Sequence, residues 1–360
     1  MNGQPSTRSP SNFESAQTTS PMPSKPAPLT PDEHETIYRT LVQPVLFDAA
    51  PGGHDKPTLV LLGGQPGAGK SRSTARLLAE YDGMVALTGD DLRIFHPQFR
   101  SLVTEQPEQA GSILAEATRG WVRAALDDAL TRRHSLLLEG TFGDPDTTLA
   151  TATRFRDAGF HVRIIAVASP RVLSIVSAAS RYLRDRKLGT PARFTRLSAH
   201  DRGYHGTTRL IDSLQSSSPT ARVTIISRNG NVLYDREHDN MDSTISDAAT
   251  ALHDGRQPAS WGARSTMELL GELKQITGYA ISSGQLTPEF AELLDHAHQL
   301  TLAEVIPKLS VAPDSPQARF IQQAVSEQLV ALRRAAEPAG RLDANLTPRP
   351  EVAAARLELG

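Results

Sequence analysis

The chain has 360 residues, a formal net charge of −2 and no cysteine. This length allows two or three compact units, or one domain with extensions. The near-neutral charge gives no overall basic field, so no nucleic-acid partner is expected. The lack of cysteine excludes disulfides and thiolate metal sites, and it fits a reducing, cytoplasmic compartment.

The first segment, residues 1–29, is rich in Ser, Pro, Thr and Gln. It holds too little apolar surface to offset chain entropy, so a disordered tail is predicted. A leader read by a specialised secretion system would have the same composition, whereas a standard signal peptide needs an apolar core. Apolar runs elsewhere are about strand length, short of the roughly 20 residues of a membrane helix, so no membrane contact is expected.

A helix is predicted to open the next segment, residues 30–56. Thr30 is its N-cap, Pro31 takes the first helical position, and Glu33 completes a capping box. Pro44 is expected to end or kink this helix. The segment could serve as an accessory helix or as part of an internal inhibitor.

Residues 57–238 alternate between short apolar strands and amphipathic helices. All-apolar runs such as "TLVLL" and "HVRIIAVA" are typical of parallel strands covered on both faces. Helices are predicted between them, at about 70–80, 108–132 and 144–159. "RVTIISRNGNVLYD" predicts a late strand, a turn and a return strand. The pattern predicts an α/β fold with a doubly wound parallel sheet.

Beyond the sheet, residues 239–340 are predicted to be helical. Thr287 and Pro288 form a cap and first-position pair, and an apolar stripe follows them. Residues 341–360 are rich in Pro and Ala without a clear period, which predicts a loose tail. The helical stretches at both ends therefore read as extensions of a central α/β domain.

A phosphate-binding loop follows the first predicted strand of this domain. It fits the pattern G-x-x-x-x-G-K-[ST], with a strand before it and a helix after it. Glycines let successive amides point at an anion, and the helix N-terminus adds partial positive charge. The lysine would reach the β- and γ-phosphates of ATP, and the serine would ligate Mg²⁺. The loop comprises Gly64, Gln65, Pro66, Gly67, Ala68, Gly69, Lys70 and Ser71.

The reaction class depends on the carboxylates near this loop. A switch GTPase would need a guanine-reading N-K-x-D string, which does not occur. A kinase needs a carboxylate that takes a proton from the acceptor hydroxyl. Asp90, at the end of the second strand, is the predicted general base, and its neighbour Asp91 is expected to point elsewhere. Alternatively, both cap a helix. Arg93 could pin the acceptor or pair with a carboxylate.

The third strand ends with Glu139 and Thr141. Glu139 could hold Mg²⁺ through water, hydrogen-bond a sugar hydroxyl, or form an ordinary ion pair at a strand end. Among the basic residues from 181 to 196, Arg184, Arg186 and Lys187 are interpreted as a solvated helix face. Arg193 differs, because it lies in a predicted loop that could close over a triphosphate as a lid. His200 is interpreted as a packing or capping residue.

Five strings resemble the zeta toxins, which are kinases of UDP-N-acetylglucosamine. They are "LLGGQPGAGKS", "GDDLRIFHPQF", "LLLEGT", "PARFTRLSAHDRGY" and "IISRNGNVLYD", in the same order and with similar spacing. The resemblance covers residues 57–236. It implies a P-loop kinase that moves the ATP γ-phosphate to the 3′-hydroxyl of the amino sugar, and so blocks the supply of peptidoglycan precursor.

The resemblance also implies individual roles. Lys70 is the phosphate lysine, Ser71 the Mg²⁺ ligand, Asp90 the base and Arg193 the first lid arginine. Glu139 and Thr141 match residues that line the sugar-nucleotide pocket. Either Arg202 or Arg209 matches the second lid arginine, and Arg228 matches a residue near the nucleotide base. A small helical antitoxin that covers the ATP site is an implied partner.

Two alternatives stay open from the residues alone. The kinase could act on another acceptor, such as a nucleoside, a dinucleotide, an antibiotic or a polynucleotide end, because acceptor choice is made by loops. The chain could also be a non-kinase regulator that binds ATP and acts by contact. Asp90 separates these classes, because a kinase needs the base and a pure binder does not.

Overall fold

We describe the fold from a computed structural model of the chain. The structure describes residues 29–50, 52–81, 83–214, 219–237, 241–257, 263–312 and 314–337. Apart from residue 29, the expected tails over 1–29 and 341–360 lie outside these described residues. None of the described helices is long and apolar enough to cross a membrane.

The described strands form one six-stranded sheet in the order β2-β3-β1-β4-β5-β6. All neighbours pair in parallel except β5 and β6, which form the antiparallel hairpin predicted from the sequence. The mixed α/β fold with a mostly parallel sheet is therefore confirmed. The strands are β1 Thr58–Gly63, β2 Val85–Thr88, β3 Leu136–Gly140, β4 His161–Ala168, β5 Arg222–Ser227 and β6 Val232–Glu237.

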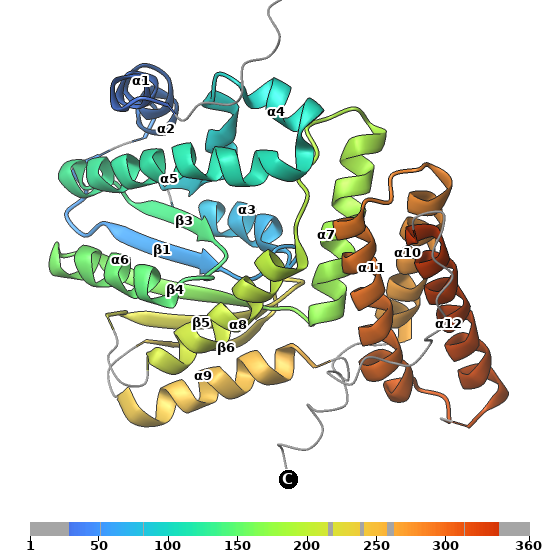
Figure 1. The fold of residues 1–360 in the computed structure, drawn as a ribbon. Coiled ribbons are helices and arrows are strands. Elements are labelled where there is room, and N and C mark those ends of the chain that lie inside the picture. The colour runs from blue at the N-terminus through green and yellow to red at the C-terminus, as the bar shows by residue number, and fades with distance from the viewer. Residues whose placement is uncertain are drawn as a thin grey trace, which may run out of the picture.

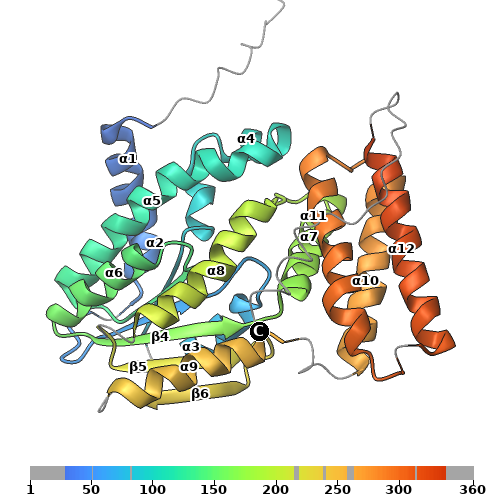
Figure 2. The ribbon, with the colours of Figure 1, turned by 60° about the horizontal axis from the view of Figure 1, so that its bottom comes forward.

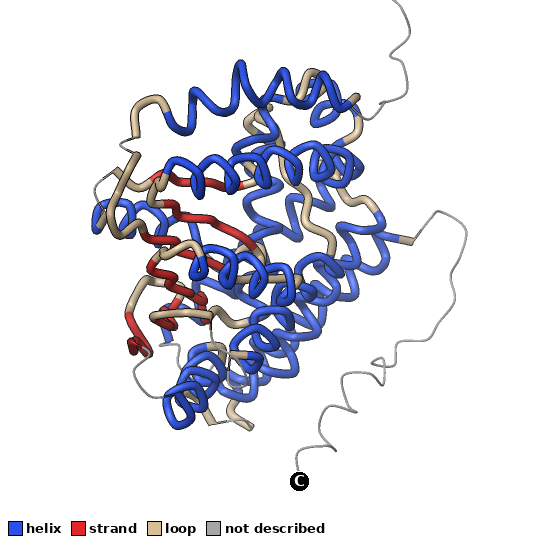
Figure 3. Tube along the Cα trace, turned by 90° about the vertical axis from the view of Figure 1, so that its left-hand side faces the viewer, coloured by secondary structure: helices blue, strands red, loops and turns tan. Residues whose placement is uncertain are grey.

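Helices cover both faces of this sheet (Figures 1 and 3). Leu59 and Leu61 of β1 point into a core shared with helices α5, α6, α8 and α9, whereas Val60 and Leu62 point to the opposite face, toward α3. This alternation explains why the strand reads as uniformly apolar. The helices are α3 Lys70–Glu80, α5 Pro107–Arg132, α6 Pro145–Asp157, α8 Leu197–Ser213 and α9 Met241–Gly255.

The N-terminal helical segment packs against α5. It comprises α1 Pro31–Ile37, a π-helical turn over Tyr38–Val42 and α2 Gln43–Phe47, and the predicted capping box of Thr30 is present. Pro44 does not end the helix. The wider π-helical turn comes directly before it, so the missing amide of Pro44 falls in the first turn of α2, where it needs no partner. His34 stacks on the buried Trp121 of α5 at 5.1 Å between ring centroids.

Helix α7, Arg171–Lys187, stands between the sheet and a C-terminal helical bundle (Figures 1 and 2). The bundle consists of α10 Ala263–Ser282, α11 Pro288–Leu300 and α12 Pro316–Ala336. Thr287 caps α11 as predicted, and the apolar side of that helix is buried. Apolar residues of α7 share one core with this bundle, so the bundle packs on the helix that borders the phosphate loop.

Candidate active site

The phosphate loop connects β1 to α3, and α3 begins at Lys70 as the motif requires. Gly67 and Gly69 have φ values of +78° and +104°, which glycine adopts without strain. A side chain at Gly67 would also overlap the backbone carbonyl of Ser174 in α7. Lys70 donates hydrogen bonds from Nζ to the carbonyls of Gly64 at 2.9 Å and Gln65 at 3.3 Å.

One large cleft of about 1260 Å³ opens beside this loop. The loop residues that line it are Pro66, Gly67, Gly69, Lys70 and Ser71. The other three loop residues, Gly64, Gln65 and Ala68, are buried and do not line the cleft. Of the eight residues predicted to bind phosphate, five thus face the cleft, and the other three are buried beneath them.

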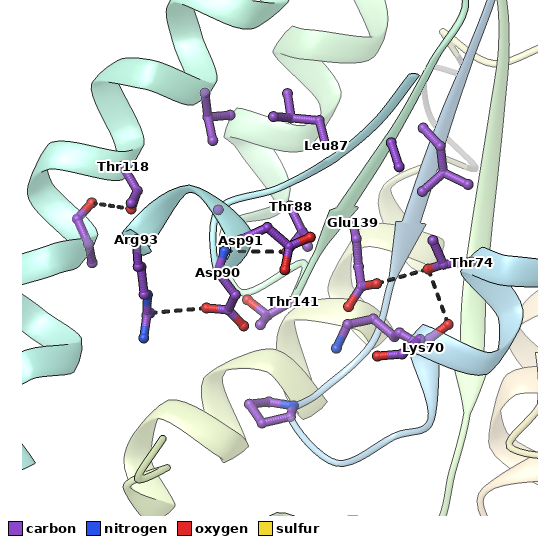
Figure 4. Close-up of a pocket in the computed structure, with 18 of the residues that line it drawn as sticks. Lys70, Thr74, Leu87, Thr88, Asp90, Asp91, Arg93, Thr118, Glu139 and Thr141 are labelled. Carbon is purple, nitrogen blue, oxygen red and sulfur yellow. Dashed lines mark hydrogen bonds and ion pairs between the residues drawn. The ribbon is translucent and has the colours of Figure 1, made fainter. Parts of the chain in front are cut away.

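Lys70 lines the cleft, and its pKa is shifted from the ordinary lysine value. Burial lowers its pKa to about 8; the Glu139 carboxylate opposes the shift, and Arg193 and Arg181 add to it. Glu139 is held in turn by a 2.9 Å hydrogen bond from the Thr74 hydroxyl of α3 (Figure 4). A phosphate group would therefore meet a cation whose charge is only partly balanced by protein.

Asp90 lies across the cleft from the phosphate lysine (Figure 4). Its carboxylate pairs with Arg93 at 3.1 Å and also with Arg193. Its side chain makes no capping hydrogen bond to the following 3₁₀ helix, Asp91–Phe95, so the capping alternative is not realised. Asp90 is thus a carboxylate held by two arginines.

Asp91 also lines the cleft, which corrects the prediction that only one of the two aspartates would face it. The prediction assumed strand-like alternation. The chain turns into the 3₁₀ helix at this residue, so the alternation no longer applies. Burial, followed by the charge of Glu139, raises the pKa of Asp91 above its ordinary value.

Two arginines line the cleft on the side of α7, Arg193 and Arg181. Burial lowers the pKa of Arg193 below its ordinary value. The sequence alone predicts no separate role for Arg181, which belongs to the basic stretch of α7. Neither Arg202 nor Arg209 is among the lining residues, so neither of the two expected partners of Arg193 faces the cleft.

The β5–β6 turn approaches the loop from the other side. Arg228 donates to the carbonyl of Gly67 and, at 2.7 Å, to the hydroxyl of Ser177 on α7. Arg76 of α3 donates to the carbonyl of Gly230 at 3.1 Å. Arg228, proposed from the resemblance to contact the nucleotide base, lines the cleft while its guanidinium braces the phosphate loop.

The far half of the cleft lies between α5, α6 and the ends of β2 and β3. Glu139 and Thr141 line it where β3 ends, as the sequence predicted. From the helices it is lined by apolar, hydroxyl and charged side chains, among them Thr118, Arg119, Val122, Arg123, Thr151 and Arg154. Figure 4 shows Thr118 beside the Asp90 and Arg93 pair. The helix residues of this half were not predicted from the sequence, because they share only a helix face.

His200 lies outside the cleft and is fully buried. Its Nε2 is 2.8 Å from the hydroxyl of Ser174, and its Nδ1 is 3.0 Å from the Asp201 carboxylate. These contacts agree with the interpretation of His200 as a packing residue. Within the described part of the chain, no group of three or more His, Cys, Asp or Glu side chains is arranged to hold a metal.

Comparison with known proteins places this site in a family. The model of the zeta toxin family matches residues 46–239, more than half of the chain. Toxin zeta of Enterococcus hirae is 25% identical over 183 residues, which are 50% of this chain and 64% of that toxin. Toxin PezT of Streptococcus pneumoniae serotype 4 is 28% identical over 186 residues, which are 50% of this chain and 72% of PezT.

A solved structure supports the fold. It comes from a characterisation of the PezAT chromosomal toxin-antitoxin system of Streptococcus pneumoniae, and it superposes with a TM-score of 0.58 at 21% identity. The superposition covers 69% of this chain and 98% of that one. The sequence match to the Enterococcus hirae toxin covers less than two thirds of that toxin's length. The family model, in contrast, covers the whole six-stranded sheet and the residues that line the cleft. The chain belongs to the zeta toxin family.

Proposed function

We propose that this protein is a kinase that transfers the γ-phosphate of ATP to the 3′-hydroxyl of UDP-N-acetylglucosamine. The observation that carries the proposal is the shared cleft of the phosphate loop, Asp90 and two arginines. Its volume of about 1260 Å³ exceeds the 300–1,000 Å³ of an ordinary ligand pocket, which suits two substrates side by side. Membership of the zeta toxin family supports the same activity.

The reaction assigns one task to each group. Asp90 accepts the proton of the acceptor hydroxyl, whose oxygen forms a bond to the γ-phosphorus while the bond to the β,γ-bridging oxygen breaks. Lys70 neutralises charge on the β- and γ-phosphates, and Arg181 and Arg193 neutralise it on the group in transfer. Among the described residues, the Nε atoms of Arg181 and Arg93 are buried without a hydrogen-bond partner, which suits an anion-binding role.

The donor set of the cleft fits Mg²⁺. Ser71 offers an exposed hydroxyl at the start of α3, and the Glu139 carboxylate lines the same cleft, so the site provides the oxygen ligands that this ion prefers. Ser71 would hold the ion, and the ion, when bound, supplies charge neutralisation on the phosphates. Few protein ligands are needed, because Mg²⁺ keeps several waters and phosphate oxygens.

A phosphate-bearing acceptor is favoured over an uncharged one by Arg119 and Arg123, which lie one helical turn apart on α5 and both line the far half of the cleft. UDP-N-acetylglucosamine carries such a diphosphate. Its phosphorylation would withdraw a peptidoglycan precursor, so the protein would act as a toxin in the cytoplasm. A small helical antitoxin over the ATP site is the corresponding proposed partner, in line with the toxin-antitoxin system named for the superposed structure.

The test is direct. Wild-type protein and Asp90→Asn are each incubated with Mg-ATP and UDP-N-acetylglucosamine, and the products are followed by phosphorus NMR and mass spectrometry. We expect a sugar nucleotide heavier by one phosphoryl group from the wild type alone. ADP without that product would remove this acceptor and lead to a screen of phosphate-bearing metabolites. No ADP from any acceptor would contradict the kinase proposal and favour a regulator that only binds ATP.

A further inference from the structure

A buried chain of hydrogen bonds runs behind the phosphate loop. Nε2 of Gln65 donates to the hydroxyl of Ser174 at 3.1 Å, and that hydroxyl lies 2.8 Å from Nε2 of His200. Nδ1 of His200 lies 3.0 Å from the Asp201 carboxylate, which Arg171 holds with two further bonds of 2.9 and 2.6 Å. The chain thus links the loop to the first turns of α7 and α8.

The direction of each proton in this chain follows from charge. Burial raises the pKa of Asp201, but the bonds from His200 and Arg171 outweigh it and hold that pKa well below its usual range. Asp201 is therefore an acceptor, and Nδ1 of His200 carries a proton. Burial lowers the pKa of His200 despite Asp201, so the ring is neutral and its Nε2 is an acceptor for the Ser174 hydroxyl. The same hydroxyl also lies 2.9 Å from the Arg171 carbonyl and 3.2 Å from the Pro170 carbonyl. Ser174 in turn accepts from Gln65.

Serine, histidine and aspartate in this order resemble a nucleophilic triad, but the surroundings exclude that chemistry. Ser174 and His200 are both fully buried, so no substrate reaches the hydroxyl. The amide of Gln65 also occupies a lone pair of the Ser174 oxygen. The arrangement therefore orients groups and does not attack them.

Helix α8 also supports the loop by direct contact. A Cβ atom at Gly203 would lie 3.1 Å from the Cα of Gln65 and 3.2 Å from the carbonyl of Thr141, tighter than ordinary packing. Glycine at this position therefore brings the helix close to both the phosphate loop and the end of β3. This packing contact does not depend on the hydrogen bonds described above, and it involves the same loop residue, Gln65.

We propose that Ser174, His200 and Asp201 are positioning residues that hold the phosphate loop in its anion-binding shape through Gln65. The proposal rests on the proposed function only for the identity of the anion, ATP. Gln65 is suited to transmit this effect, because it bonds both to Lys70 and to the residues behind the loop. Its carbonyl accepts from Lys70, while its side chain donates to the Ser169 carbonyl and to the Ser174 hydroxyl of α7. A rotation of this residue would displace the lysine and the amides that follow it.

The test uses four variants of the full chain. Ser174→Ala removes the central hydroxyl, and His200→Phe keeps a ring without hydrogen bonds. His200→Gln keeps an acceptor for Ser174 and serves as the conservative rescue. Thr207→Val is the matched control, because Thr207 is an equally buried residue of α8. Among the described residues, its hydroxyl bonds only to the carbonyl of Gly203 in its own helix, at 2.8 Å.

Two measurements are made on each variant. Calorimetric titration with a Mg-loaded, non-hydrolysable ATP analogue should show an affinity loss of about 5- to 10-fold for Ser174→Ala and His200→Phe, the scale of one neutral hydrogen bond. The loss stays moderate because Gln65 keeps its 2.8 Å bond to the Ser169 carbonyl. Hydrogen exchange of the amides from residue 64 to 70 should speed up in the same two variants, and His200→Gln and Thr207→Val should match the wild type.

The outcomes separate the two proposals. Affinity and loop exchange that stay within twofold of wild type in Ser174→Ala would overturn the positioning role. Equal affinity losses in Thr207→Val, at an equal fall in Tm, would overturn it too, because the effect would then follow general stability. A wild-type protein that binds no ATP analogue would overturn the proposed function instead, and the exchange of the loop amides would still test the positioning role.

Discussion

Thr74 and Glu139 are joined by a hydrogen bond of 2.9 Å from the Thr74 hydroxyl to the Glu139 carboxylate, which ties α3 to the end of β3. The same hydroxyl lies 3.3 Å from the carbonyl of Lys70, but a charged acceptor is the stronger partner. The charge of Glu139 raises the pKa of Lys70 against the effect of burial. One hydroxyl thus holds the anion that helps to keep the phosphate lysine protonated.

Thr74→Val should therefore weaken ATP binding, by about 3- to 10-fold on the scale of a hydrogen bond to a charged group. The β-branched shape is kept, so the helix is little disturbed. Thr74→Ser restores the donor and is the control. Affinity for Mg-ATP measured by titration at pH 7.5 tests the change, and equal affinities for the valine and serine variants would refute the role of the hydroxyl.

The pKa of Lys70, about 8 in the free protein, predicts a proton uptake on binding. Lys70 is mostly protonated at pH 7 and mostly neutral at pH 9, and the phosphates favour the protonated form. ATP affinity should thus fall as pH rises above about 8, by up to tenfold per pH unit. Calorimetry in buffers of different ionisation enthalpy should detect proton uptake at pH 8.5. Its absence there, or its persistence in Lys70→Met, would argue against this lysine as the source.

Asp90→Asn should lower turnover by at least about 100-fold and leave ATP binding within a fewfold of wild type, because only the proton acceptor is lost. Asp91→Asn is the matched control, since it removes a neighbouring carboxylate from the same cleft. We expect its turnover to stay within about tenfold of wild type. Initial rates of ADP formation measure the turnover of both variants. A larger loss for Asp91→Asn than for Asp90→Asn would identify Asp91 as the general base instead.

Arg181→Ala and Arg193→Ala should each reduce turnover more than ATP affinity, by about 100-fold against less than tenfold, if the guanidinium groups act mainly on the transferring phosphate. Arg202→Ala serves as the control, because Arg202 does not line the cleft. Steady-state rates and binding constants are compared for the three variants. If turnover and ATP affinity fell by the same factor, these arginines would bind ATP in the ground state rather than stabilise the transition state.

The sequence predicted those elements whose signals are local. The helix from Lys70 to Glu80 follows from the glycines before it, and the cap at Thr287 from its proline. The phosphate loop and Asp90 were also predicted, because both are tied to strand ends, and parallel strands bring their ends to one edge.

The rest depends on packing between distant segments. Arg181 was missed because helical periodicity places it on α7 without saying which side of α7 meets the cleft. That orientation is set by the C-terminal bundle, which buries the opposite, apolar side. Arg202 and Arg209 were expected because they follow Arg193 in the chain, whereas the second arginine in the cleft precedes it. The role of Gln65 was equally hidden, since its partners lie more than 100 residues away.

Helix α7 contacts the phosphate loop through Ser174 and shares its apolar core with the C-terminal bundle, so it joins these two parts of the fold. The family match ends at residue 239, yet apolar side chains of α7 such as Ile175 and Leu183 are buried against residues beyond that point. Each large aliphatic side chain returned to water costs about 1.5–3 kcal/mol, and a whole domain is stable by only about 5–15 kcal/mol. Loss of the C-terminal bundle would therefore expose the apolar side of α7 to water and destabilise the helix that contacts the phosphate loop.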